Sequence, residues 1–149
     1  MKTPILNLGS AEVSLLVDTP VLAELRKGKR CHPGVRAFFE STEEDLYLSV
    51  LTLGELQAAI ERVRARDMKA GRTWDRWLHQ LVSDHGERVL PIDEAVVEEW
   101  GVLLAAHPCP LREGLLAATA LAYDLTLLAH GSPVFDALGV AVIDPFATK

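Results

Sequence analysis

Four carboxylate side chains stand beside predicted elements of regular structure, where they could hold a metal ion. Asp18 directly follows a short apolar run, and Glu55 comes a few residues after a second such run. Glu113 opens a helical pattern, and Asp136 follows another apolar run near the end of the chain. If these acids meet at one edge of the fold, they repel one another unless a cation lies between them. Mg²⁺ or Mn²⁺ suits such a site, because both are hard cations that take oxygen ligands.

Each of these acids also has a structural explanation. Asp18 or its neighbour Thr19 could cap a helix, since Asp is favoured at a helix cap and the proline that follows is favoured in the first turn. Glu55 and Glu113 lie in first helical turns, where the helix dipole stabilises an acid by roughly 0.3–1 kcal/mol. The joint placement of the acids is what favours a functional role, and Asp136 is the weakest member of the set.

Short apolar runs alternate with stretches of helical periodicity along the chain. The predicted strands are Val13–Val17, Leu46–Val50, Arg88–Pro91, Leu125–Leu128 and Val140–Ile143. The predicted helices are Leu53–Arg66, Asp93–Ala106 and Gly114–Asp124. This alternation predicts an α/β fold with a mostly parallel five-stranded sheet that is covered by helices on both faces. Ligands of such sheets bind beyond the carboxyl ends of the strands, so we expect the chemistry at that edge.

The composition is that of an ordinary globular domain, with 49% hydrophobic and 24% charged residues in a chain of 149. One sizeable core is possible at this length without disulfides, so we expect a single domain over residues 1–149. Cys31 and Cys109 lie far apart and form no CxxC pair, which predicts free thiols. No stretch approaches the roughly 20 apolar residues of a membrane span, and no apolar signal segment is present, so we expect a cytoplasmic protein without a membrane partner.

The net charge of −6 is unevenly distributed along the chain. One basic group consists of Arg26, Lys27, Lys29, Arg30 and Arg36, and a second consists of Arg62, Arg64, Arg66, Lys69, Arg72 and Arg76. From Trp77 onward only Arg88, Arg112 and Lys149 stand against ten acids. A basic flank beside an acidic half would lead a phosphate backbone toward a metal site. Solvated helix faces with i,i+4 ion pairs explain the second basic group at least as well.

Other nucleotide- and phosphate-binding α/β folds lack their motifs in this chain. A dinucleotide-binding domain needs GxGxxG after the first strand, where this sequence reads DTPVL from Asp18. No P-loop lysine motif is present either. A phosphatase of the haloacid dehalogenase type would have an Asp in place of Pro20, and a response-regulator receiver domain would have an acidic pair at the end of the first strand.

Four blocks of the sequence resemble PIN domains of the VapC toxin type. LLVDTPVLAELRKG resembles the opening block, in which a strand runs into Asp18 and a Glu-Leu pair follows. LYLSVLTLGEL resembles the second block, with Glu55 at its acidic position, and REGLLAATALAYDLTLL resembles the third, with Glu113 where the family normally has Asp. GVAVIDPF resembles the usual ending. The likeness extends from about Val13 to Phe146, and residues 1–12 form an N-terminal extension outside it.

The resemblance implies a compact α/β/α sandwich, usually dimeric, that hydrolyses RNA with Mg²⁺ or Mn²⁺ held by three or four acids. Such proteins are commonly silenced by a small antitoxin protein. The catalytic residues that the resemblance implies are Asp18, Glu55 and Glu113, and the metal ligands are these three together with Asp136. The chain departs from the family pattern at Pro20 (usually Asn), at Ala129-His130-Gly131 (usually Thr-Arg-Asn) and at Val134-Phe135 (usually Asp-Phe). Asp136 replaces the missing fourth acid only if its loop shifts.

Two structural expectations follow, together with two candidate functions. We expect the Asp18, Glu55 and Glu113 side chains to converge at the carboxyl edge of the sheet, close enough to share one hydrated ion. We also expect a two-fold homodimer formed by apolar residues of the early helices. Those residues are Leu22, Leu25, Val35, Phe38 and Phe39. The leading function is a metal-dependent endoribonuclease of a toxin–antitoxin pair. The alternative is a PIN domain that has lost hydrolysis and binds RNA or an antitoxin, because a ligand misplaced by an ångström can reduce the rate by about 100-fold.

Overall fold

Parallel strands form the centre of the molecule. The computed structural model describes residues 13–147 of the chain. In this range five strands form one sheet in the order β3-β2-β1-β4-β5, and every neighbouring pair is parallel. The strands are β1 (Leu15–Val17), β2 (Leu46–Ser49), β3 (Val89–Leu90), β4 (Thr126–Leu128) and β5 (Val142–Ile143). The predicted α/β fold with a five-stranded sheet is therefore confirmed.

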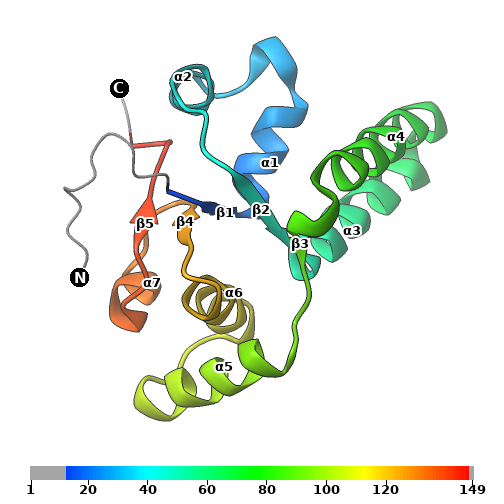
Figure 1. The fold of residues 1–149 in the computed structure, drawn as a ribbon. Coiled ribbons are helices and arrows are strands. Elements are labelled where there is room, and N and C mark those ends of the chain that lie inside the picture. The colour runs from blue at the N-terminus through cyan, green and yellow to red at the C-terminus, as the bar shows by residue number, and fades with distance from the viewer. Residues whose placement is uncertain (1–12, 148–149) are drawn as a thin grey trace.

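Helices cover both faces of this sheet (Figure 1). The helices on one side are α1 (Thr19–Arg26), α2 (Pro33–Ser41), α3 (Val50–Arg66) and α4 (Met68–His85). Those on the other side are α5 (Glu94–Ala106), α6 (Leu111–Ala122) and α7 (Pro133–Leu138). Short 3₁₀ turns cover Gly28–Arg30 and Gly86–Arg88. The resulting arrangement of helix, sheet and helix is the three-layer sandwich expected from the resemblance.

Alternating side chains of the central strand divide the core in two. Leu15 and Val17 of β1 pack with α1, α2, α3 and α4, whereas Leu16 packs with α5, α6 and α7. Successive residues of a strand point to opposite faces, so a strand that is apolar throughout can fill both cores. All three residues are completely buried. The continuous apolar runs that predicted the strands are thus the signature of a parallel sheet covered on both faces.

The start of α3 corrects one predicted boundary. Val50 was predicted to end the second strand, but it is the first residue of α3. The Ser49 hydroxyl accepts a hydrogen bond from the Leu51 amide at 3.0 Å and caps the helix. The helix therefore begins at Val50, three residues before its predicted start at Leu53. The strand therefore turns directly into the helix without a loop.

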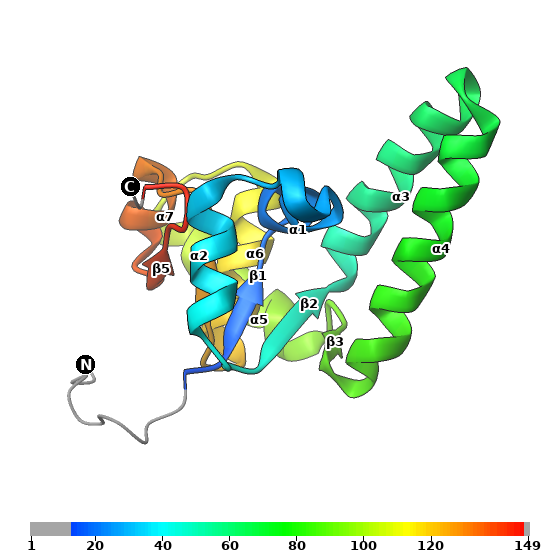
Figure 2. The same ribbon diagram turned by 90° about the horizontal axis from the view of Figure 1, so that it is seen from above.

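Helices α3 and α4 form a long hairpin that projects beyond the sheet (Figure 2). Asp67 joins them: its amide donates to the Val63 carbonyl at the end of α3, and its carboxylate accepts from the Ala70 amide at the start of α4. A Cβ at Gly71 would lie 2.8 Å from the Arg64 Cα, so the two helices approach too closely for a side chain there. Helices α4 and α7 were not predicted from the sequence.

The apolar residues expected at a dimer interface divide into two groups. Leu22 and Val35 are buried within this chain, at 1% and 0% exposure, and belong to the core beneath α1 and α2. For these two residues the prediction of a free apolar surface is wrong, because one face of the sheet needs them to fill its core. Leu25, Phe38 and Phe39 are only partly buried against the same core.

Two smaller expectations concern thiols and membranes. Cys31 and Cys109 are both free thiols, as predicted. Among residues 13–147, no helix has the length and apolar character needed to cross a membrane.

Candidate active site

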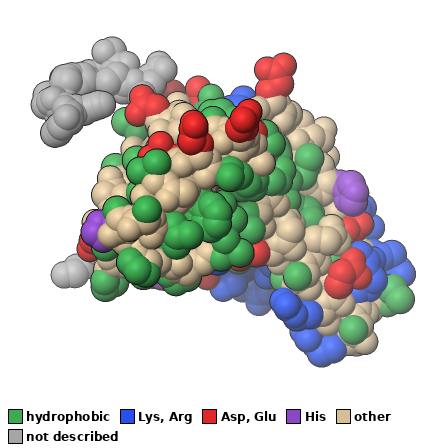
Figure 3. All heavy atoms as spheres, turned by 90° about the horizontal axis from the view of Figure 1, so that it is seen from below, with side chains coloured by type: hydrophobic (Ala, Val, Ile, Leu, Met, Phe, Trp, Pro, Cys, Tyr) green, Lys and Arg blue, Asp and Glu red, His purple; other side chains and the backbone are tan. Residues whose placement is uncertain are grey.

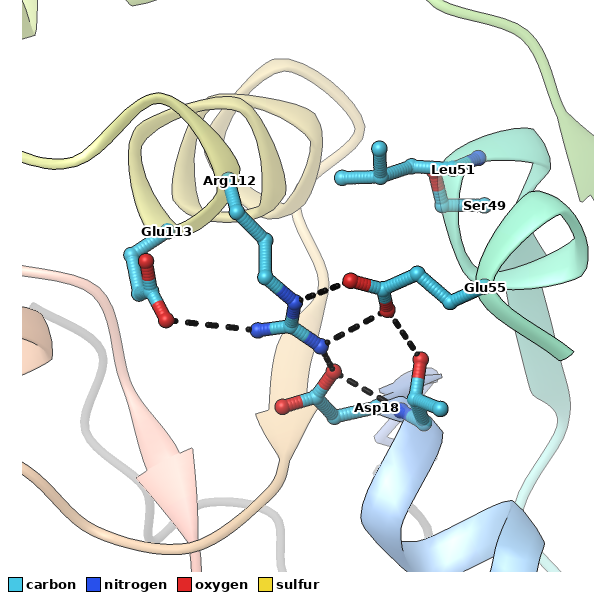
Figure 4. Close-up of polar contacts among 7 residues, drawn as sticks. Asp18, Ser49, Leu51, Glu55, Arg112 and Glu113 are labelled. Atoms are coloured by element: carbon cyan, nitrogen blue, oxygen red, sulfur yellow. Dashed lines mark hydrogen bonds and ion pairs between the residues drawn. The ribbon is translucent and has the colours of Figure 1, made fainter. Parts of the chain in front are cut away.

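Three acids from distant parts of the chain surround one arginine (Figure 4). Asp18 is the residue after β1, Glu55 lies in the second turn of α3, and Arg112 and Glu113 are neighbours in the first turn of α6. β1 and β2 end at the carboxyl edge of the sheet, and α6 begins there because a crossover helix runs antiparallel to the strands it connects. The topology therefore brings all four side chains to one edge.

Each nitrogen of the Arg112 guanidinium faces a carboxylate. Nη2 donates to Asp18 Oδ1 at 2.5 Å and to Glu55 Oε1 at 3.0 Å, and Nε donates to Glu55 Oε2 at 2.5 Å. Nη1 lies 3.5 Å from Glu113 Oε2, which is a longer contact. The pair with Glu55 is bidentate, which is the strong geometry for an arginine and a carboxylate. Arg112 thus binds Asp18 and Glu55 firmly and Glu113 loosely.

Asp18 caps a helix, as one of the two readings of the sequence predicted, and it also pairs with Arg112. Its Oδ1 accepts a hydrogen bond from the Thr19 amide at 2.7 Å and caps α1, and the same oxygen pairs with Arg112. The residue is only 4% exposed. Burial raises the pKa of Asp18, because the ionised form loses water, although the nearby Arg112 opposes that rise. The cap and the ion pair therefore use one buried carboxylate.

Glu55 is held by a second residue as well as by Arg112. The Thr19 hydroxyl donates a hydrogen bond to Glu55 Oε1 at 2.5 Å. Burial works against ionisation of Glu55, but the hydrogen bonds from Arg112 and Thr19 outweigh it and lower the pKa of this carboxyl. The hydrogen bonds to Glu55, together with the charge of Asp18, raise the pKa of Arg112 above its ordinary range. At neutral pH Glu55 and Arg112 are both charged.

Asp136, the fourth predicted acid, lies elsewhere in the described structure. It is an exposed residue of α7, and none of the hydrogen bonds or ion pairs found among residues 13–147 joins its side chain to Asp18, Glu55 or Glu113. The structure therefore does not bring Asp136 into the group around Arg112.

The loop with the unusual family block is held by a different acid, Asp144. Its Oδ2 accepts from the Gly131 amide at 2.9 Å, and its Oδ1 accepts from the Phe146 amide at 2.8 Å. Val134, at the position where the family has an acid, is partly buried and packs against the core around α6. His130 stacks on Phe146 with ring centroids 3.8 Å apart. At the position where the family pattern has its fourth acid, this chain therefore has the apolar side chain of Val134. Asp144 instead accepts hydrogen bonds from backbone amides.

Sequence reasoning missed Arg112 and the hydroxyl of Thr19. A signal for Arg112 was present. A cation in the first turn of a helix is disfavoured by the helix dipole, so a basic residue there needs acidic partners. Arg112 is also one of few basic residues in the acidic half of the chain.

The donor set suits a divalent cation, but the arginine stands between the acids. Three carboxylates from three elements supply the hard oxygens that Mg²⁺ or Mn²⁺ takes. Yet within residues 13–147 no three Asp, Glu, His or Cys side chains are grouped closely enough to hold one ion. In this arrangement each of the three carboxylates contacts the guanidinium of Arg112, so their assignment as ligands of one ion stays a prediction.

The second basic group forms a surface at the end of the α3–α4 hairpin (Figure 3, lower right). Its exposed members, which we call the hairpin basic surface, are Arg62, Arg66, Lys69, Arg72 and Arg76. Arg64 differs from them, because it is partly buried and lies within ion-pair distance of Glu61 and Asp75. The five exposed charges are free to attract an anionic partner.

Known proteins resemble this chain over most of its length. VapC ribonuclease Y4jK of Sinorhizobium fredii is 27% identical over 140 residues, which cover 89% of this chain and 97% of that protein. Toxin FitB of Neisseria gonorrhoeae is 26% identical over 137 residues, which cover 89% of this chain and 98% of that protein. The crystal structure of FitAcB from the same organism superposes with a TM-score of 0.80 at 27% identity, over 90% of this chain and 99% of that one.

The fold and the sequence agree with a single family. The structure of FitAB bound to an IR36 DNA fragment also matches, with a TM-score of 0.77 at 25% identity, over 91% of this chain and 97% of that one. The family profile described as PIN domain matches residues 15–139, a span that begins with β1 and ends after α7. This chain therefore belongs to the PIN domain family.

Proposed function

We propose that this chain is the toxin of a toxin–antitoxin pair and hydrolyses RNA as an endoribonuclease. The observation that carries the proposal is the meeting of Asp18, Glu55 and Glu113 at the carboxyl edge of the sheet. Membership of the PIN family supports it, as do relatives named VapC ribonuclease and Toxin FitB.

We propose Asp18, Glu55 and Glu113 as the residues that would hold Mg²⁺ or Mn²⁺. PIN nucleases of the VapC type generally use divalent ions, and the carboxylate donors fit one in chemical kind. A bound ion would supply a water of lowered pKa and stabilise charge on the phosphate. Thr19 orients Glu55 through its hydroxyl, and the Asp18 cap fixes that carboxylate to α1. The site thus rests on rigid elements, which is what precise ligand positions require.

The proposed substrate and partners follow from charge and from the relatives. The hairpin basic surface would neutralise phosphates of the RNA backbone, which supply most of the non-specific affinity for nucleic acid. We propose a cognate antitoxin protein as the partner, because a relative is named Toxin FitB and the VapC-type toxins that the sequence resembles are commonly silenced by a small antitoxin protein. We also propose a homodimer formed through Leu25, Phe38 and Phe39.

A second candidate function has its own support. This chain has no acid at the family's fourth acidic position, where Val134 stands, and Gly131 replaces the usual Asn nearby. Arg112 lies among the other three acids, Asp18, Glu55 and Glu113. A PIN domain with such a site could retain RNA or antitoxin binding while hydrolysis is lost. The two candidates differ only in whether the acids support chemistry.

The deciding experiment is RNA cleavage by the purified chain. The ribonuclease proposal expects cleavage of a structured RNA with single-stranded loops in Mg²⁺ or Mn²⁺, and no cleavage after chelation. A variant that restores the family pattern, Glu113→Asp with Val134→Asp, should cleave faster, provided that circular dichroism shows it folded. If the unaltered chain cleaves no RNA of a broad panel and the restored variant does, the ribonuclease proposal fails. The binding function then replaces it.

A further inference from the structure

Arg112 is placed where a catalytic cation would be expected, and it has no other strong attachment. Its guanidinium contacts all three acids of the site: Asp18 after β1, Glu55 of α3 and Glu113 of α6. Among the described residues, these carboxylates are the only hydrogen-bond or ion-pair partners of the side chain. Pro110, which precedes α6, provides no side-chain cap. The acids alone therefore hold the arginine in place.

The charge of this arginine is permanent. A lysine or histidine at this position could lose its proton beside a metal ion, but an arginine keeps its charge in proteins. A divalent ion and the guanidinium therefore cannot occupy the space between Asp18 and Glu55 together without strong repulsion. The side chain is 29% exposed, so it has a route from the acids to solvent. Metal entry requires that the arginine leave.

We propose that Arg112 is an intramolecular cation that competes with the divalent ion for Asp18, Glu55 and Glu113. The inference rests on the proposed function, since it concerns the same site. In the resting chain Arg112 lies between the acids and balances part of their negative charge. An ion binds only the fraction of molecules in which Arg112 has withdrawn. When the binding-competent fraction is one tenth, the apparent affinity falls about tenfold. Arg112 therefore determines how much metal the site requires.

The test is Mn²⁺ binding, measured by calorimetry and by the loss of the free Mn²⁺ paramagnetic resonance signal. The proteins are the full chain, Arg112→Gln and a control, Arg64→Gln. The control removes the charge of another arginine that faces two acids, Glu61 and Asp75, neither of which belongs to the group around Arg112. We expect Arg112→Gln to bind Mn²⁺ at least about tenfold more tightly than the unaltered chain. The control should bind like the unaltered chain.

Equal or weaker Mn²⁺ binding by folded Arg112→Gln overturns the inference. If this variant unfolds because its three acids repel one another, Mn²⁺ should restore its circular dichroism spectrum. If the spectrum is not restored, Arg112→Lys decides. Its compact ammonium group cannot contact three carboxylates in the same forked geometry. Tighter Mn²⁺ binding by Arg112→Lys supports the inference, and unchanged binding overturns it.

RNA cleavage by the same proteins separates this inference from the proposed function. If Arg112→Gln binds Mn²⁺ more tightly but neither protein cleaves RNA, the inference about Arg112 holds and the ribonuclease proposal fails. Cleavage by both proteins with equal Mn²⁺ affinity rejects the competing arginine and retains the ribonuclease.

Discussion

Asp18 carries two functions on one carboxylate, and an amide at this position separates them. Asn caps helices about as well as Asp, so Asp18→Asn should keep α1 and change the free energy of unfolding by less than about 1 kcal/mol. The amide lacks the charge that binds a metal ion or Arg112, so we expect RNA cleavage to disappear. Cleavage rates and urea unfolding measure the two effects.

Asp93→Asn is the matched control for this substitution. Asp93 caps α5 by accepting from the Val96 amide at 3.0 Å, and it lies outside the group around Arg112. This variant should cleave RNA at the rate of the unaltered chain. Full cleavage by Asp18→Asn would show that Asp18 is a helix cap and no more.

Asp144 predicts a pH dependence of stability. Burial works against its ionisation, but hydrogen bonds from the Gly131 and Phe146 amides outweigh it and lower the pKa of Asp144 below its ordinary value of 3.8. A lowered pKa in the folded state stabilises the fold above the ordinary value, and this contribution is lost as the pH falls through the lowered pKa. At pH 7, Asp144→Asn should therefore reduce the free energy of unfolding by about 1 kcal/mol.

The difference between Asp144→Asn and the unaltered chain should shrink as the pH falls below 3.8. Urea unfolding at several pH values measures it. Glu43→Gln, at an exposed position, serves as the control. A difference that is constant from pH 7 to pH 3 contradicts the assignment of this stability to the Asp144 carboxylate.

At the scale of elements, the α3–α4 hairpin depends on the close approach of two helices. A Cβ at Gly71 would lie 2.7 Å from the Arg64 Cβ and 2.8 Å from its Cα, and backbone cannot move away as a flexible side chain can. We expect Gly71→Ala to destabilise the chain by about 1–3 kcal/mol in urea unfolding. The gain of about 1 kcal/mol in helix propensity offsets only part of the overpacking.

Gly101→Ala in α5 is the control that measures the gain in helix propensity without overpacking. A Cβ at this position meets nothing within 4 Å, so the substitution should stabilise the chain. If both alanine variants are stabilised equally, the helices of the hairpin are not in the close contact described.

At the scale of the whole molecule, we expect two copies of the chain to form a homodimer. Since Leu22 and Val35 are buried in the core of one chain, Leu25, Phe38 and Phe39 are the members of the predicted interface set that remain for a dimer. We expect light scattering to give twice the chain mass of 16.3 kDa. Phe39→Arg should halve that mass while circular dichroism stays unchanged, because a charged residue is costly in an apolar interface. A monomer mass for the unaltered chain at high concentration rejects the dimer.

Much of this architecture was determined by local properties of the sequence. Continuous apolar runs predicted strands buried on two faces, and helical periodicity between them predicted parallel crossovers. Since the carboxyl ends of parallel strands share one edge, the positions of Asp18 and Glu55 after such runs were enough to predict that they meet. Strand ends and the start of α3 were less certain, because a single cap such as Ser49 decides between strand and helix.

The chemistry of the edge was decided by tertiary structure alone. Arg112 pairs with an acid 94 residues away in the chain and another 57 residues away, and no local pattern specifies partners at such separations. The same holds for Leu22 and Val35, whose burial depends on how α1 and α2 pack over the sheet. Periodicity tells which face of an element is apolar, but only the packed chain determines whether that face meets its own core or another molecule. In the same way, only the packed chain places an arginine among acids that sequence reasoning assigned to a metal.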